Sequence, residues 1–419
     1  MKPKILSTLP GYTGRQFAAD ALAGVTVALV ALPLSIAIAI ASGATPGAGL
    51  VTAVVAGFLI SALGGSRVQI GGPTGAFIVV VYGVIAAHGY DGLVLATLMA
   101  GLILIVAGLL RAGNLIAFVP EAVVDGFTLG IAIIIASSQL KDFLGLGVSV
   151  PADFLPKLEA LWAARGEINP WAIAVGLAAL VLIVALRRLF PRFPGLIVAM
   201  AAVSGWAAWS ALPVDTIGSR FGALPAGLPV PAFPEITAAR LAELLPSALV
   251  IAFLAAVESL LSAMVADRMI EGQHRSNAEV MAQGWANIGS ALFGGLPATG
   301  AIARTATNVR AGGRTPVAGI VHALAILLAM LVAGPLAGYL AMPALAALLL
   351  TTAWNMSEPH KWRQHLSAPL AERVLLVLTM ALTVLTDLTV AIGTGVALGL
   401  ALRLRERLGV AEEWSGPDR

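Results

Sequence analysis

Long apolar runs are the feature of this sequence that most restricts its fold. They recur from Asp20 almost to the C-terminus, and a bilayer core about 30 Å thick needs roughly 20 apolar residues per helix. Hydrophobic residues make up 59% of the 419, charged residues only 11%, and the mean hydropathy is +0.93. Such a composition excludes an ordinary soluble domain. We therefore expect an all-α membrane protein that crosses the bilayer many times.

Gly, Pro and charged residues divide the apolar runs into fourteen predicted transmembrane segments, seven in each half. The first half holds segments 20–41, 48–63, 73–87, 93–110, 122–139, 170–188 and 194–211. The second half holds segments 246–267, 278–294, 301–310, 315–333, 335–352, 370–386 and 388–403. The segments at 73–87 and 301–310 are too short to cross as complete helices.

The basic residues predict the orientation of these segments. If the N-terminus is cytoplasmic, nineteen of the 25 Lys and Arg fall in inside loops and five in outside loops, and Arg304 falls within a segment. This asymmetry satisfies the positive-inside rule. We expect a multi-pass protein of a bacterial-type inner (plasma) membrane with both termini in the cytoplasm. Since topology explains the basic clusters, a net charge of +3 gives no support for nucleic acid as a partner.

An odd number of crossings per half makes the second half an inverted copy of the first. We expect the first repeat at 1–211 and the second at 246–408. A proline-rich stretch at 212–245 predicts an extracellular linker between them, and 141–169 predicts a short amphipathic surface helix.

The third segment of each half carries a matching Gly/Pro motif, at 71–76 and at 295–301. Pro73 and Pro297 are 224 positions apart, and Pro33 and Glu258 are 225 apart, so the register holds over both segments. Gly and Pro interrupt helical hydrogen bonding, and bare backbone is tolerated inside a bilayer only where protein or a wet cavity satisfies it. Each motif therefore predicts a short extended strand that reaches mid-membrane and continues into a half-helix.

Two such half-helices would meet near the midplane with their N-termini directed at one cavity. Unpaired N–H groups and the positive ends of both helix dipoles favour an anion there. The alternative is that the glycines only allow close helix packing. The candidate substrate-binding residues are Pro33, Gly72, Pro73, Thr74, Gly75, Ala76, Gly300, Ala301, Ile302, Ala303 and Arg304.

Two charged residues inside predicted segments need an explanation, because each is costly in a bilayer unless paired or hydrated. Burial disfavours the ionised form of a carboxyl, so Glu258 is a candidate coupling residue that takes up a proton. Ser259 and Ser262 would add hydroxyls beside it. Arg304 would supply fixed positive charge behind the anion. The alternative is a permanent structural ion pair between Glu258 and Arg304.

Other kinds of site find no support in the sequence. The chain has no cysteine, which excludes disulfides, thiolate metal sites and cysteine nucleophiles. No metal-ligand cluster, catalytic Ser/His/Asp set or phosphate-binding loop is visible. We expect neither an enzyme nor a cofactor or metal site.

Several motifs together resemble the sulfate permease (SulP) family of anion transporters. The first segment, from Asp20 to Pro33, is similar to the opening signature of that family. The stretch 287–300, with 304–308 and 312–316 after it, is similar to its most distinctive region. The resemblance covers nearly the whole chain.

The resemblance implies two inverted repeats of seven segments, arranged as a core domain (20–110 and 246–334) and a gate domain (122–211 and 335–408). It also implies an anion site between segments three and ten, and an elevator-like movement of core against gate. Members usually continue into a cytoplasmic STAS domain, whereas this chain stops at Arg419, so we expect that domain to be absent.

One difference in the first segment bears on the substrate. Sulfate-type members often carry Gln and Tyr where this chain has Leu34 and Ile38, as in bacterial members that resemble bicarbonate or dicarboxylate carriers. Bicarbonate-type relatives tend to place Asp, in a sodium site, where this chain has Glu258. We interpret the longer carboxylate as favouring proton coupling.

The leading hypothesis is a secondary transporter that symports a small carboxylate or oxyanion with a proton, such as a C4-dicarboxylate (for example fumarate), bicarbonate or sulfate. The alternatives are a sodium-coupled bicarbonate symporter, an anion exchanger and a passive anion channel. A nucleobase–cation symporter would place acidic residues on segments eight and ten, and Arg304 argues against it. A scaffold without transport gives no reason for the broken segments. A homodimer that meets through the gate segments is compatible with the sequence.

Overall fold

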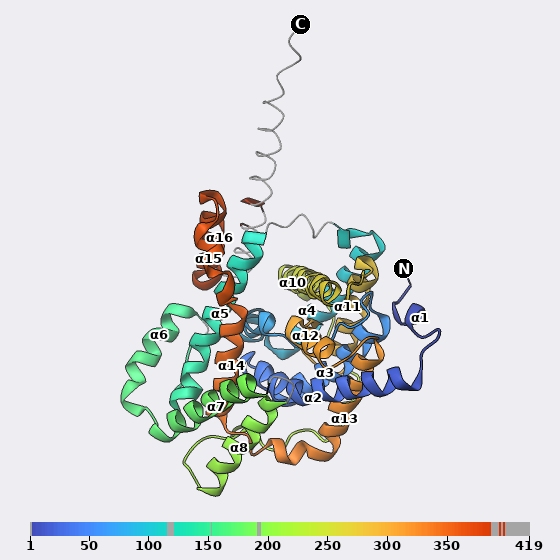
Figure 1. The fold of residues 1–419 in the computed structure, drawn as a ribbon. Coiled ribbons are helices and arrows are strands. Elements are labelled where there is room, and N and C mark those ends of the chain that lie inside the picture. Colours follow the sequence, from blue (N-terminus) through green and yellow to red (C-terminus); the bar gives the residue numbers. More distant parts are fainter. Residues whose placement is uncertain are drawn as a thin grey trace.

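The computed structural model describes residues 2–114, 121–151, 153–190 and 194–386, and the single residues 394, 397 and 398. Most of the predicted segment 388–403 lies outside the described residues. Helices dominate the described part (Figure 1). A two-stranded sheet, β1 with β2, lies among them. The expected all-α membrane architecture is confirmed.

The helices of the first half are α1 (Ile5–Thr8), α2 (Gly14–Ala41), α3 (Pro46–Leu63), α4 (Ile78–Leu109), α5 (Glu121–Leu144), α6 (Phe154–Ala163), α7 (Pro170–Leu189), α8 (Gly195–Trp209) and α9 (Ile217–Phe221). Those of the second half are α10 (Ala238–Ile270), α11 (Ser276–Leu292), α12 (Ile302–Arg310), α13 (Val317–Ala337), α14 (Met342–Met356), α15 (Trp362–Ser367) and α16 (Leu370–Leu385). The short elements are β1 (Gly71–Gly72), β2 (Thr299–Gly300) and the 3₁₀ turns η1 (Gly75–Phe77), η2 (Ala112–Asn114), η4 (Ala164–Glu167) and η5 (Pro359–Lys361).

Seven helices in the described ranges are long and apolar enough to cross a membrane: α2, α3, α4 with η1, α5, α7, α10 and α13. Helix α8 is apolar but shorter. Local sequence sets several of their starts. Thr13 and Gln16 form a capping box at the start of α2, and proline occupies the first turn of α3, α7 and α14, where its missing N–H costs no helical bond. The total of fourteen segments stays a prediction.

The helices form two packing groups. Helices α2, α3, α4, α10, α11, α12 and α13 contact one another, and α5, α7, α8, α14 and α16 form the second group. In Figure 1 the second group lies mainly to the left of the first. Helices α2 and α4 contact members of both groups. The core and gate domains, and their movement as separate bodies, stay predictions.

Two predicted boundaries can be compared with the observed helices. The break predicted between the segments 73–87 and 93–110 is present, because α4 consists of two helices that meet at a kink where Gly89 has non-helical backbone (φ +70°). The predicted linker 212–245 contains α9 and the first turns of α10. Pro246 inside α10 does not end that helix, because a proline at this depth costs one backbone bond that neighbouring groups in a packed membrane bundle compensate.

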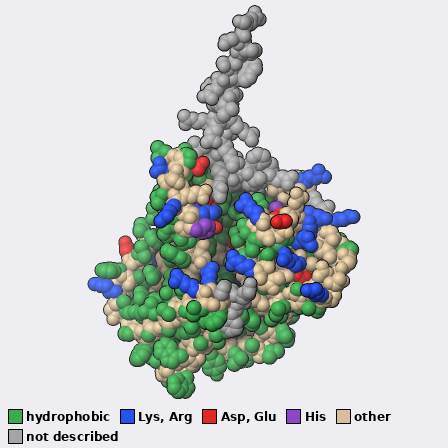
Figure 2. Space-filling view, in the orientation of Figure 1, with side chains coloured by type: hydrophobic (Ala, Val, Ile, Leu, Met, Phe, Trp, Pro, Cys, Tyr) green, Lys and Arg blue, Asp and Glu red, His purple; other side chains and the backbone are tan. Residues whose placement is uncertain are grey.

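The N-terminus, the loop after α3 and the α10–α11 loop lie on the same face. The Lys4 ammonium donates to the Gln273 carbonyl at 2.7 Å, and the Arg275 guanidinium donates to the Lys2 carbonyl at 2.8 Å. The Arg275 amide donates to the Gly65 carbonyl at 3.0 Å. Figure 2 shows Lys and Arg side chains gathered on the face that these elements share with α15. The positive-inside rule predicts that this face is cytoplasmic, and the orientation stays a prediction.

Candidate functional site

The two Gly/Pro motifs meet as an antiparallel pair of strands in the interior. Gly71 of β1 is paired with Gly300 of β2, and Gly72 with Thr299. All four residues are buried. The pairing continues beyond the strands, because the Ala301 amide donates to the Ile70 carbonyl at 2.8 Å. The backbone groups that the broken helices leave free therefore satisfy one another away from lipid.

Each strand leads directly into a helix. Strand β1 is followed by η1 and α4, and β2 by α12. The residues that precede these helices, Thr74 and Ala301, have extended backbone and give no side-chain cap to the first helical N–H groups. Uncapped N–H groups at a helix start are ready donors for an anion. The predicted arrangement of strand and half-helix is present at both motifs.

Arg304, in the first turn of α12, brings a full positive charge to this place. Its side chain is 2% exposed. One guanidinium nitrogen, Nη2, donates to the Pro73 carbonyl at 2.9 Å and to Ser35 Oγ at 3.3 Å. Nε and Nη1 have no hydrogen-bond partner. A buried guanidinium with unused donors is suited to bind an anion, since buried polar groups are otherwise almost always paired.

Gly72 is needed for this placement of Arg304. Its φ is +150°, and a Cβ there would lie 2.4 Å from Arg304 Nη1. A side chain at position 72 would therefore both strain the backbone and displace the guanidinium.

Glu258, on α10, approaches the same strand-to-helix junction from another side. Its Oε2 accepts a hydrogen bond of 2.9 Å from Thr74 Oγ1, and Thr74 is 6% exposed. Glu258 itself is partly exposed. The structure therefore joins the predicted acidic residue to the residue that starts η1. No salt bridge joins it to Arg304, so the alternative of a permanent ion pair is not what this conformation contains.

Ser259 and Ser262 lie on the same helix but contact other groups. Ser259 Oγ accepts from Gln69 Nε2 at 3.0 Å and donates to Glu279 Oε1 at 3.3 Å. Ser262 Oγ lies 3.3 Å from Thr305 Oγ1. Neither hydroxyl is bonded to Glu258 in this conformation, and their role as coupling-ion ligands stays a prediction.

The other predicted residues surround the junction. Pro33 is buried inside α2, and Gly75 lies against Met356 of α14 and Ile135 of α5. At the start of α12, Ile302 is 38% exposed and Ala303 is also exposed. The α12 side of the site is therefore open, whereas the α4 side is covered by the second packing group.

A network of buried polar side chains, which sequence reasoning missed, supports the strands. The Glu279 carboxylate is fully buried and accepts from the Gly65 and Ser66 amides at 2.7 and 3.0 Å. Asn287 forms a two-way bond with the backbone of Ala298, at 2.9 Å in each direction. These residues share one stripe of α11, at 279, 283, 287 and 290. That helical spacing of polar residues within an apolar segment was the signal that could have found them.

The two broken segments of this membrane helix bundle bring uncapped helix starts, an arginine and an acidic residue to one place. This combination defines the class of membrane anion transporters. The family model of the sulfate permease family matches residues 17–379. The chain therefore belongs to the sulfate permease family, as the motifs suggested.

Two relatives show how close the similarity is. The chain is 43% identical over 398 residues to YvdB of Bacillus subtilis, named as a candidate sulfate transporter, covering 94% of this chain and 75% of YvdB. It is 31% identical over 413 residues to the bicarbonate transporter BicA of Picosynechococcus, covering 95% of this chain and 72% of BicA.

Solved structures agree with the fold. The transmembrane domain of a cyanobacterial BicA matches with a TM-score of 0.83 and 30% identity, over 93% of this chain and 98% of that one. Murine Slc26a9 in an inward-facing state matches with a TM-score of 0.87 over 96% of this chain and 71% of that one. At 18% identity, the second similarity concerns the fold alone.

Proposed function

We propose that this protein is a secondary active transporter that carries a small carboxylate or oxyanion together with a proton. The observation that carries the proposal is the hydrogen bond of 2.9 Å between Glu258 Oε2 and Thr74 Oγ1. It connects a titratable group to the start of η1, beside the Arg304 guanidinium. Uptake of a proton by Glu258 would remove a negative charge from the neighbourhood of an incoming anion, so anion and proton would favour each other's binding.

Proton coupling is favoured over sodium coupling by the partners of the two serines. Sodium, a hard cation, requires several oxygen ligands that converge on one point. Ser259 and Ser262 would supply two of these ligands. Instead, the Ser259 hydroxyl is bonded to Gln69 and Glu279, and the Ser262 hydroxyl to Thr305. A proton needs only the carboxylate.

Transport would proceed by alternating access. The helices that hold Arg304 and Glu258 belong to one packing group, and Gly75 of that group lies against Ile135 and Met356 of the other. An elevator-like displacement of the first group would carry the intact site past that contact. The anion would then be released on the opposite side.

The experiment is uptake into proteoliposomes that contain the purified protein. Sulfate, bicarbonate, chloride and fumarate are each offered with an inward proton gradient, an inward sodium gradient, or neither. We expect one small carboxylate or oxyanion to accumulate above its outside concentration only with the proton gradient. Accumulation driven by sodium alone would support the sodium symporter, and a gradient-independent conductance would support a channel.

A further inference from the structure

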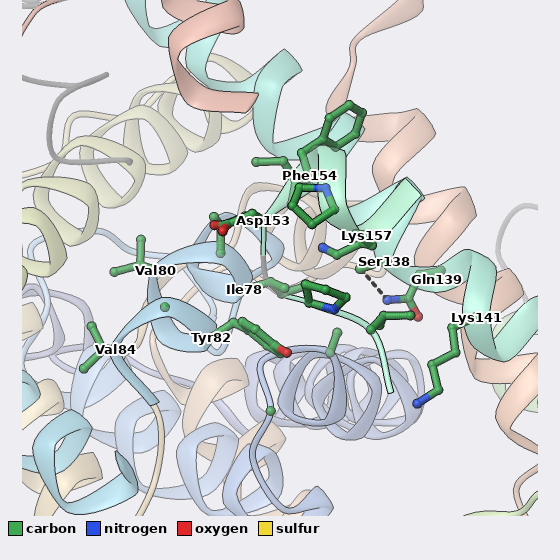
Figure 3. Close-up of a pocket in the computed structure, with 18 of the residues that line it drawn as sticks. Ile78, Val80, Tyr82, Val84, Ser138, Gln139, Lys141, Asp153, Phe154 and Lys157 are labelled. Carbon is green, nitrogen blue, oxygen red and sulfur yellow. Dashed lines mark hydrogen bonds between the residues drawn. The ribbon is translucent and has the colours of Figure 1, made fainter. Parts of the chain in front are cut away.

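A large cavity lies apart from the site at Arg304 and Glu258. Its volume is about 1030 Å³, and none of the strand residues of that site lines it. Helices α4 and α10 of the first packing group and α5, α6 and α16 around the second form its walls. The cavity lies between the two packing groups and reaches Ile78, in the first turn of α4 (Figure 3). We therefore call it the vestibule, and it lies on the α6 side of the molecule.

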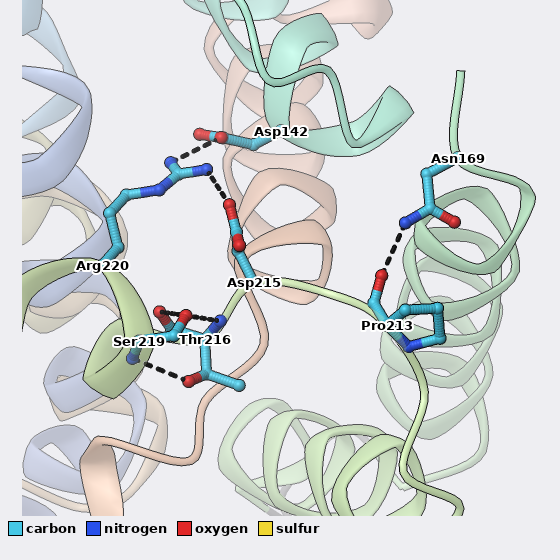
Figure 4. Close-up of polar contacts among 7 residues, drawn as sticks. All are labelled: Asp142, Asn169, Pro213, Asp215, Thr216, Ser219 and Arg220. Carbon is cyan, nitrogen blue, oxygen red and sulfur yellow. Dashed lines mark hydrogen bonds and ion pairs between the residues drawn. The ribbon is translucent and has the colours of Figure 1, made fainter. Parts of the chain in front are cut away.

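Two of the cationic groups that line this vestibule already have acidic partners. The Arg220 guanidinium is held between Asp142 at 2.7 Å and Asp215 at 2.8 Å (Figure 4). His88 Nδ1 lies 3.1 Å from the Glu243 carboxylate. These pairs tie the rim of the vestibule together and leave little net positive charge for a ligand.

Lys157 differs from them. It is only 6% exposed, and its ammonium makes no hydrogen bond or ion pair with the described residues. Figure 3 shows its side chain extending from α6 toward the space that Tyr82 and Gln139 border. Asp153, at the N-terminal cap of α6, accepts a hydrogen bond of 3.0 Å from the Lys157 amide through its backbone carbonyl, but its carboxylate forms no ion pair with the Lys157 ammonium.

Packing fixes the inward direction of Lys157. Leu161 follows it by four residues, so both lie on one face of α6. Leu161 is 8% exposed and packs with Leu146 and Ala164 in a small apolar cluster. Lys157 therefore cannot turn to solvent without breaking the contact of α6 with the rest of the protein.

A buried ammonium that has no acidic group in direct contact is unfavourable. Burial accordingly lowers the pKa of Lys157, and the negative charge of Asp153 opposes that shift only in part. An anion in the vestibule would supply the missing counter-charge. The cavity is large enough for a hydrated oxyanion or a dicarboxylate.

We propose that Lys157 forms an outer anion site, which takes up the transported small carboxylate or oxyanion in the vestibule before it reaches Arg304. This inference rests on the proposed function for the identity of the anion. A positive group in a cleft with low-dielectric walls raises the local concentration of anions. The outer site thereby increases the rate at which the inner site is loaded from the α6 side.

The test compares Lys157→Met with Lys141→Met, a control that removes a lysine lining the same vestibule. Anion uptake is measured in whole cells and in inverted vesicles, so that each face of the protein is supplied in turn. We expect Lys157→Met to raise the KM for the anion about tenfold when the anion is supplied from the α6 face only. The kcat should stay unchanged, and Lys157→Arg should restore the wild-type KM. A KM within twofold of wild type on both faces would overturn the proposal.

A binding measurement separates this proposal from the proposed function. The thermal unfolding midpoint of each purified variant is measured with increasing sodium sulfate or sodium fumarate at constant ionic strength. We expect the anion-dependent stabilisation to need higher anion concentrations in Lys157→Met than in Lys141→Met. If the wild type shows no coupled transport, the proposed function fails, and this comparison still decides the outer site. Identical titrations of the two variants would refute it. Size-exclusion profiles of Lys157→Met and Lys157→Gln establish that the variants are folded.

Discussion

At the scale of single residues, the site depends on a guanidinium that is only partly satisfied by protein. Arg304 gives one nitrogen to the Pro73 carbonyl and Ser35, and leaves Nε and Nη1 unpaired. A lysine keeps the charge but lacks the planar fork of donors, so it cannot hold the Pro73 carbonyl and an anion together.

We expect Arg304→Lys to raise the KM for the transported anion by roughly tenfold or more, because a hydrogen bond to a charged group contributes about 1.5–3 kcal/mol. The measurement is initial uptake over a range of anion concentrations. Arg310→Lys is the matched control, since Arg310 is an exposed residue at the other end of α12. Equal KM values for the two variants would show that Arg304 does not contact the anion.

A second residue prediction concerns the hydroxyl of Thr74. We expect Thr74→Val to keep anion exchange but to shift the pH at which coupled uptake is half-maximal, because Glu258 loses a bonded hydroxyl that affects its charged form. Uptake is measured from pH 5 to 9. Thr307→Val, whose hydroxyl bonds only to the Ala303 carbonyl of its own helix, is the control. A pH profile of Thr74→Val that matches both the control and wild type would contradict the prediction.

The residues of the site were predictable where they broke a local rule. Glycine and proline are unusual inside apolar membrane segments, and so are charged residues such as Arg304 and Glu258. Each of them costs free energy in a bilayer, which made these positions stand out in the sequence. Gln69 and Glu279 were not predicted, because their roles depend on which helices become neighbours. Lys157 was hidden for a similar reason, since the sequence of α6 gives no sign that its lysine faces inward.

At the scale of elements, α4 and α11 approach so closely that glycines form the contact. A Cβ at Gly101 would lie 2.8 Å from the Gly284 carbonyl, and one at Gly284 would lie 2.6 Å from the Gly101 carbonyl. This contact holds α11, with its supporting Glu279 and Asn287, against the part of α4 that follows the kink at Gly89.

We expect Gly101→Ala to lower the free energy of unfolding by about 1–3 kcal/mol, because a methyl group there overpacks the contact. Gly83→Ala is the control in the part of α4 before the kink, where a Cβ meets nothing within 4 Å; it should be neutral or slightly stabilising. The measurement is the thermal unfolding midpoint in detergent. A midpoint of Gly101→Ala equal to that of Gly83→Ala would show that the two helices are not in this contact.

The existence of these elements was easier to predict than their bounds. Long apolar runs indicated the spanning helices, and the Gly/Pro motifs indicated the strands. The break predicted between two segments near Gly89 is present as a kink at that residue, where two helices meet within α4. The start of α10 at Ala238 lies before the predicted start at 246, because Pro246 lies inside that helix and does not begin it.

At the scale of the whole molecule, the predicted topology can be tested because the chain has no cysteine. Ser149 lies in the loop before α6 and Ser367 at the end of α15, and both are exposed. We expect a membrane-impermeant maleimide to label Ser149→Cys but not Ser367→Cys in intact cells, and both after the membrane is permeabilised. Labelling of Ser367→Cys alone in intact cells would invert the orientation.

The central claim is that Glu258 couples anion movement to proton movement. The most direct test is the ratio of protons to anions that enter proteoliposomes, measured with a pH dye inside and a labelled anion outside. Glu258→Gln is compared with wild type and with Glu243→Gln, which removes an exposed carboxylate from the same helix. We predict that Glu258→Gln exchanges anions but moves no protons with them, while the other two proteins move both. Proton entry with Glu258→Gln at the wild-type ratio would contradict the account.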